Sequence, residues 1–241
     1  MKTRIMSLLI SSVCMACLAQ QKVEGIQAKI DFAIETSIES HNLRAINSLE
    51  DSLNCSKANP YTSYWQAYIK LQKSLYYMGQ HSDSAQVTLT EGIKILSDKE
   101  NCTTEDFALL AYLQIMSIRY LSGLEAGVMS QKAANNARKA IQADEQNLRG
   151  WFVSAMLDYY TPKQFGGKKR CEELWMKALE LPEQRMPNPY LPSWGKEDAY
   201  VMLTTYYKEL GNNKKLLPLI EKALKEYPQN ETFKKYAQNT K

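Results

Sequence analysis

The stretch that decides the fold lies near the C-terminus, where residues 197–228 read EDAYVMLTTYYKELGNNKKLLPLIEKALKEYP. Apolar side chains recur every three or four positions in each half of it, which is the period of an amphipathic α-helix. Gly211 separates the two halves and Pro228 follows the second, and both residue types are typical of helix ends. The stretch therefore predicts two helices joined by a tight turn.

The same pattern recurs upstream, and sustained strand-like alternation is nearly absent. Second helices end alike at residues 47–49, 91–93, 139–141, 177–179 and 222–224, so the repeat is 38 to 48 residues long. We predict first helices over 23–39, 61–79, 104–122, 147–160 and 196–210. Second helices are predicted over 42–53, 82–97, 128–143, 167–180 and 213–226, with a last short helix over 230–238.

The C-terminal unit resembles the tetratricopeptide repeat (TPR) family. The residues at the family spacing are Tyr200, Leu203, Tyr207, Gly211, Leu216, Ile220, Ala223 and Pro228. Thr204 and Leu216 stand where the family usually has smaller residues. The resemblance implies an all-α fold in which stacked repeats bury a continuous core. It would be a right-handed α-solenoid of about five antiparallel helix pairs plus a C-terminal capping helix, a single TPR-like domain over residues 20–241.

A narrower resemblance involves the fourth repeat. Pro162 and the pair Gly166-Gly167 precede the Lys177-Ala-Leu179 helix end, and a Pro-rich loop over 182–195 follows. These features are similar to the exported TPR proteins associated with TRAP solute transporters, the T component. That resemblance implies a helical protein of the periplasm that works with a solute-binding protein.

Residues 1–19 are predicted to be a signal peptide. Lys2 and Arg4 precede an apolar run over 6–18, which is shorter than the roughly 20 apolar residues that span a bilayer. Small residues then lead to a plausible cut before Gln20. We therefore expect an exported protein of the periplasm or cell envelope; the alternative for this segment is an N-terminal anchor helix.

Lipidation at Cys17 is a further alternative, and it would give the protein a membrane contact. A lipid-attachment motif favours an aliphatic residue three positions before its cysteine, and Cys14 stands there. Cleavage before Gln20 would leave 28 basic and 26 acidic residues and three cysteines. In an oxidising compartment, Cys55 and Cys102, which lie in polar connectors, could form a disulfide; two thiols are the alternative. Cys171 is expected in the core.

Several chemistries are disfavoured. The chain has only two histidines, His41 and His81, both at polar helix junctions, so no multi-histidine metal centre is expected. A formal charge of +4 without a clustered basic face argues against nucleic-acid binding. Gly166-Gly167 before three basic residues lacks the P-loop spacing, which leaves a flexible hinge or an anion site at a helix N-terminus. We expect no catalytic residue, cofactor or metal.

The first helices of TPR arrays line a concave surface, so the resemblance places many aromatic residues in a groove. The predicted groove residues are Trp65, Ile69, Tyr76, Tyr112, Phe152, Met156, Tyr159, Tyr160 and Lys208, with Trp194 of the Pro-rich loop covering one end. The alternative is that about half of the aromatic residues are core between repeats. One hypothesis is a non-enzymatic scaffold for a protein or peptide partner. The other is a TRAP-like accessory that holds a small apolar or organic-acid solute.

Overall fold

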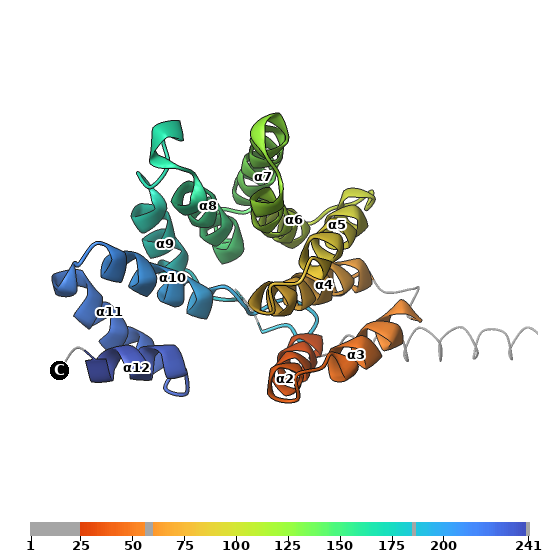
Figure 1. Ribbon diagram of the computed structural model, residues 1–241, viewed down its shortest axis with the longest axis horizontal. Coiled ribbons are helices and arrows are strands. Elements are labelled where there is room, and N and C mark those ends of the chain that lie inside the picture. Colours follow the sequence, from red (N-terminus) through yellow and green to blue (C-terminus); the bar gives the residue numbers. More distant parts are fainter. Residues whose placement is uncertain (1–24, 56–59, 185–186, 240–241) are drawn as a thin grey trace, which may run out of the picture. The chain divides into compact units, whose positions relative to one another are not determined.

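The computed structural model describes residues 25–55, 60–184 and 187–239, and within them the protein is all-helical. Five helix pairs follow one another and a single helix ends the series (Figure 1). The helices are α2 Ile26–Glu39, α3 Arg44–Asn54, α4 Thr62–Gly79, α5 Ser84–Ser97, α6 Thr104–Ser117, α7 Gly123–Ala143, α8 Leu148–Tyr160, α9 Cys171–Glu180, α10 Lys196–Glu209, α11 Asn213–Glu226 and α12 Glu231–Asn239. The predicted all-α, paired-helix fold is confirmed, and the predicted signal peptide and Cys17 lie outside the described residues.

Two helix starts differ from the prediction by four residues or more. Helix α7 begins at Gly123 rather than at 128, after a short 3-10 turn over Ile118–Tyr120. Helix α9 begins at Cys171 rather than at 167, because Gly166 and Lys168 both have positive φ and interrupt the helical backbone.

The chain forms two compact units. Unit 1 comprises the described parts of residues 1–102, with 116–129 and 186–192. Unit 2 comprises the described parts of residues 103–115, 130–185 and 193–241. The Pro-rich loop is therefore divided, since its middle belongs to unit 1 and its ends to unit 2.

Unit 1 is built on helix α4, which packs against α2, α3 and α5. The middle of the Pro-rich loop is bonded into this unit. The indole N–H of Trp65 donates to the Tyr190 carbonyl at 3.1 Å, and the Gly25 amide donates to the Pro189 carbonyl at 2.8 Å. The Tyr190 ring stacks on Tyr61 at 5.9 Å. Contacts distant in sequence thus complete the first helix pairs.

A chain of ion pairs joins three helices of unit 1. Lys70 on α4 lies 2.6 Å from both Glu50 on α3 and Glu91 on α5, and Lys73 lies 2.7 Å from Glu50. Burial raises the pKa of Glu50, but hydrogen bonds from Lys70 and Lys73 outweigh burial and leave that pKa below its usual value. The carboxylate is therefore charged at neutral pH and links the helices.

Unit 2 is organised around Arg149, a charged side chain that is only 3% exposed. Its guanidinium forms a bidentate pair with Glu105 on α6. It also donates to the carbonyls of Trp194 at 2.8 Å and Glu183 at 2.9 Å, near the two ends of the Pro-rich loop. One buried cation thus holds α6, α8 and both ends of that loop, and its donors have the acceptors that burial demands.

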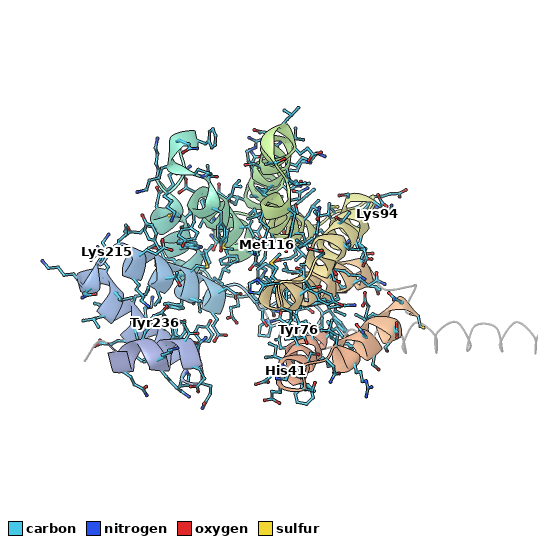
Figure 2. The ribbon with its side chains drawn as sticks, in the orientation of Figure 1. His41, Tyr76, Lys94, Met116, Lys215 and Tyr236 are labelled. Atoms are coloured by element: carbon cyan, nitrogen blue, oxygen red, sulfur yellow. The ribbon has the colours of Figure 1, made fainter. Side chains whose placement is uncertain are left out.

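Three turns within helix pairs share one backbone conformation. His41, His81 and Gly211 each have positive φ, of 53°, 55° and 62°. In each turn the following amide donates to the carbonyl five residues earlier, an arrangement typical of left-handed helix ends. These bonds are Asn42 to Ser37 at 3.2 Å, Ser82 to Tyr77 at 3.0 Å and Asn212 to Tyr207 at 2.9 Å. The two histidines therefore occupy the glycine position of the repeat, and Figure 2 shows His41 at the end of α2.

Replacing His81 by Gly should raise the free energy of unfolding by about 0.5 kcal/mol. Removing the Cβ relieves about 1 kcal/mol of strain in the left-handed backbone conformation. This gain exceeds the loss of stability that glycine causes by making the unfolded chain more flexible. Gly211→Ala is the matched opposite and should lower stability by about 0.5–1 kcal/mol, although a Cβ there meets nothing within 4 Å. Urea unfolding followed by circular dichroism measures both. A loss of stability in His81→Gly would contradict the assignment.

Replacing Arg149 by Met should lower the free energy of unfolding by about 3 kcal/mol, because Glu105 and two loop carbonyls lose their donor. Arg138 is an exposed arginine that donates to Asn135 within its own helix, α7. Arg138→Met is therefore the control and should change stability by no more than about 0.5 kcal/mol. Equal effects of the two substitutions in urea unfolding would show that Arg149 is not the central contact of unit 2.

Candidate functional site

Two of the three groove residues predicted in unit 1 are core residues. Trp65 and Ile69 on α4 have no exposed surface, and the Trp65 ring contacts Tyr64 and Tyr68 edge-on. Tyr76 is half-buried and its ring lies 5.9 Å from Tyr77. Trp65 and Ile69 therefore pack the unit, and Tyr76 keeps a partly open ring near the end of α4 (Figure 2).

Three predicted groove residues of unit 2, Tyr112, Phe152 and Trp194, come together in a largely buried cluster, and Met156 is buried as well. Phe152 is fully buried, Met156 is 3% exposed and Trp194 is 6% exposed. The Trp194 ring lies 5.8 Å from Tyr112 and 6.1 Å from Phe152. Burial raises the pKa of the Tyr112 hydroxyl well above its usual value. Because these rings fill the space under the loop, they stabilise unit 2 and leave little surface for a partner.

A second aromatic cluster of unit 2 is more open. It consists of Tyr159 and Tyr160 on α8, Trp175 on α9 and Tyr206 on α10, and we call it the Tyr159 cluster. Tyr159 lies 5.0 Å from Tyr160, 5.4 Å from Trp175 and 6.1 Å from Tyr206 between ring centres. Tyr160 is 54% exposed, whereas Tyr159 is 8% exposed. The cluster thus has a buried base and an exposed edge.

Charged groups border the Tyr159 cluster. The Tyr159 hydroxyl donates to Glu209, and Lys168 lies 3.1 Å from the same carboxylate and 4.3 Å from the centre of the Tyr159 ring. Burial, with this hydrogen bond next, raises the pKa of Tyr159. The Tyr159 hydrogen bond lowers the pKa of Glu209. The Tyr159 hydroxyl is therefore protonated at neutral pH. The Glu209 carboxylate holds this hydroxyl, and the Lys168 ammonium lies over the ring.

One polar atom in the cluster lacks a partner. The indole nitrogen of Trp175 is buried and has no hydrogen-bond acceptor among the described residues. Such a buried donor is uncommon, since leaving it unpaired costs about 1–3 kcal/mol. The N–H can donate to an acceptor that enters the cluster.

The face of α10 that meets α8 is formed by residues that the sequence analysis did not single out. Tyr206 and Glu209 contact Tyr159, whereas the repeat register predicted Lys208 in the groove. Lys208 is exposed, with its ammonium 4.9 Å from the ring centre of Tyr236 on α12. Tyr206, Glu209 and Met202 share a helical spacing of three and four residues. That spacing is the feature of the sequence that could have predicted which face of α10 packs on α8.

The connection between α8 and α9 is tightly bonded rather than a flexible hinge. The Asp158 carboxylate accepts from the amides of Arg170 and Cys171, each at 2.8 Å, and so already occupies the N-terminus of α9. The Lys168 amide donates to the Asp158 carbonyl at 2.8 Å. A Cβ on Gly167 would lie 1.9 Å from the Thr161 carbonyl oxygen. The anion site considered from the sequence is therefore filled by the protein's own aspartate.

The cysteine pairing considered from the sequence is not formed. Cys55 and Cys102 are thiols, with Cys55 exposed just after α3. The Cys102 thiol donates to the carbonyls of Leu96 at 3.6 Å and Lys99 at 3.4 Å, so it is directed at the C-terminal end of the preceding helix α5. Cys171 is buried at the start of α9, where burial, followed by the nearby Asp158 charge, raises the pKa of its thiol.

Metal sites and membrane spans are both missing from the part of the chain that the structure describes. No group of three or more His, Cys, Asp or Glu side chains is placed there to hold a metal ion. No described helix is both long enough and apolar enough to cross a bilayer.

No family model and no curated protein matches the chain. Among solved structures, the chain is similar to a thermophilic TPR protein of Thermus thermophilus, with a TM-score of 0.59. The likeness covers 87% of this chain and 97% of that chain at 14% sequence identity. The chain has a TPR-like fold. The resemblance drawn from residues 197–228 is thus confirmed at the level of the fold, and the exported, TRAP-associated subtype stays a prediction.

Replacing Gly167 by Ala should lower the free energy of unfolding by about 2–3 kcal/mol, because the added methyl group would overlap backbone atoms of Thr161. Gly79 is the control, since a Cβ there meets nothing within 4 Å and alanine favours helices. Gly79→Ala should be neutral or stabilising by up to about 1 kcal/mol. Thermal and urea unfolding compare the two, and an unchanged Gly167→Ala protein would mean that the connection is flexible after all.

Proposed function

We propose that this protein is a non-enzymatic scaffold that binds a protein or peptide partner through the exposed edge of the Tyr159 cluster. The observation that carries the proposal is Tyr160, which leaves 54% of its surface exposed beside the partly exposed Tyr206. Exposed tyrosines on rigid elements are frequent centres of binding energy, because they bring large contact area at low entropic cost. A TPR-like fold generally supports protein–protein interaction.

The charges around this edge suit a polypeptide. Lys168 and Glu209 satisfy one another beside Tyr159, so the rim offers hydrogen-bonding groups without a large uncompensated charge. Apolar or aromatic side chains of a partner can pack on Tyr160 and Tyr206 while its backbone contacts the rim. Export through residues 1–19 would place this interaction in the periplasm or cell envelope.

The test begins with a photo-crosslinking residue at position 160, which identifies the partner by mass spectrometry of the crosslinked product. Tyr160→Ala and Tyr206→Ala should each weaken the measured affinity for that partner about tenfold. Tyr159 is a poor test residue, since its removal also breaks the contact with Glu209.

Met176→Ala is the matched control, because Met176 is 43% exposed on a second helix, α9. It should leave the affinity unchanged in isothermal titration calorimetry. Unaltered binding by the tyrosine variants, or equal loss in Met176→Ala, would place the binding site elsewhere.

A second candidate function is a TRAP-like accessory that holds a small apolar or organic-acid solute. The unpaired Trp175 indole N–H supports it, because this buried donor suits a small molecule that enters the cluster better than a surface partner. Native mass spectrometry of residues 20–241 purified from the host envelope separates the two. A small-molecule adduct lost in a Trp175→Phe variant supports solute binding, and a bound polypeptide supports the scaffold.

A further inference from the structure

The connection between α8 and α9 presents one aromatic side chain to solvent. Phe165, in the 3-10 turn Lys163–Phe165, is 76% exposed and is the most exposed aromatic side chain among the described residues. Figure 1 shows this connection extending past the ends of α8 and α9. A phenylalanine with three-quarters of its surface exposed leaves a large apolar area in water, which is unfavourable unless something covers it.

The exposure of Phe165 is fixed by the backbone. Its amide donates to the Pro162 carbonyl at 2.9 Å, and the Gly166 and Gly167 amides donate to the Lys163 and Pro162 carbonyls. Gly167 fits against Thr161 without room for a Cβ. The backbone that carries Phe165 is therefore fixed, and the ring is exposed on it.

Basic residues flank the exposed Phe165 in the sequence. Lys163, Lys169 and Arg170 are all exposed, and residues 159–171 contain no acidic residue. Lys168 is directed inward to Glu209, and Arg170 lies 3.7 Å from Glu173 at the start of α9. The outward surface thus combines one aromatic ring with two lysines and one partly neutralised arginine.

We propose that this connection, residues 163–170, is a membrane-surface contact that inserts Phe165 between the headgroups of an anionic lipid bilayer. Aromatic rings favour the interface of a bilayer, and each basic residue near an anionic surface strengthens binding. An eight-residue turn is too small for a stable protein interface, which buries about 800 Å² on each partner. This contact does not depend on lipidation at Cys17 or on the Tyr159 cluster.

The test uses the chain from Gln20 to Lys241, which retains every described helix and omits the apolar N-terminal run. Flotation measures its binding to vesicles of phosphatidylglycerol and phosphatidylcholine in equal parts, and to phosphatidylcholine alone. We expect binding to the mixed vesicles only, weakened at high salt. Phe165→Ser should weaken it about tenfold, and Lys163→Gln and Lys169→Gln about fivefold each.

Phe32→Ser is the matched control, because Phe32 is 70% exposed on α2 but has Asp31 and Glu35 nearby in sequence. It should bind the mixed vesicles as the unchanged chain does. Failure of the unchanged chain to bind these vesicles, equal binding to phosphatidylcholine alone, or full binding by Phe165→Ser would overturn the proposal. Binding to poly-glutamate without binding to vesicles would also overturn it, in favour of an acidic polypeptide. Circular dichroism melts confirm that each variant is folded.

Discussion

The buried guanidinium of Arg149 is the constraint on which unit 2 depends. Five N–H donors in a planar fork can serve a carboxylate and two carbonyls at once, which a lysine could not do. Glu105, Trp194 and Glu183 supply those acceptors from three separate parts of the chain. Because an unpaired buried cation would cost several kcal/mol, all of these segments must be in place together. A loop rich in proline, which cannot form its own regular hydrogen bonds, thereby gains a fixed path.

That fixed path explains why so few predicted groove residues remain at the surface. Once the Trp194 carbonyl is bound by Arg149, the Trp194 ring lies against Tyr112 and Phe152 and closes over them. Aromatic side chains that a regular repeat would leave in a groove are thus used in packing. The Pro-rich loop does not cover the Tyr159 cluster, and Tyr160 stays exposed. The proposed binding site therefore lies on the part of α8 that the loop leaves uncovered.

Helical periodicity predicted the paired helices because it depends only on local spacing of apolar residues. The turn at Gly211 was predicted because glycine is typical of helix ends, whereas His41 and His81 gave no sign that they hold the same left-handed position. Which face of α10 meets α8 depends on tertiary packing, so the sequence analysis did not single out Tyr206 and Glu209. Asp158 lies on α8, and the chain folds back so that the amides of Arg170 and Cys171 donate to its carboxylate. No repeat pattern in the sequence predicts this contact.

The bonds between the Pro-rich loop and the first helices have a consequence for the order of events during synthesis. The hydrogen bond from Trp65 to Tyr190 spans 125 residues, and the Gly25 amide donates to Pro189. Most of the chain must leave the ribosome before these partners exist. Neighbouring helix pairs can form early, but unit 1 can be completed only after residues 189 and 190 have been synthesised and a long loop has closed. Such a chain keeps its N-terminal part open to factors that act on nascent polypeptides for most of its synthesis.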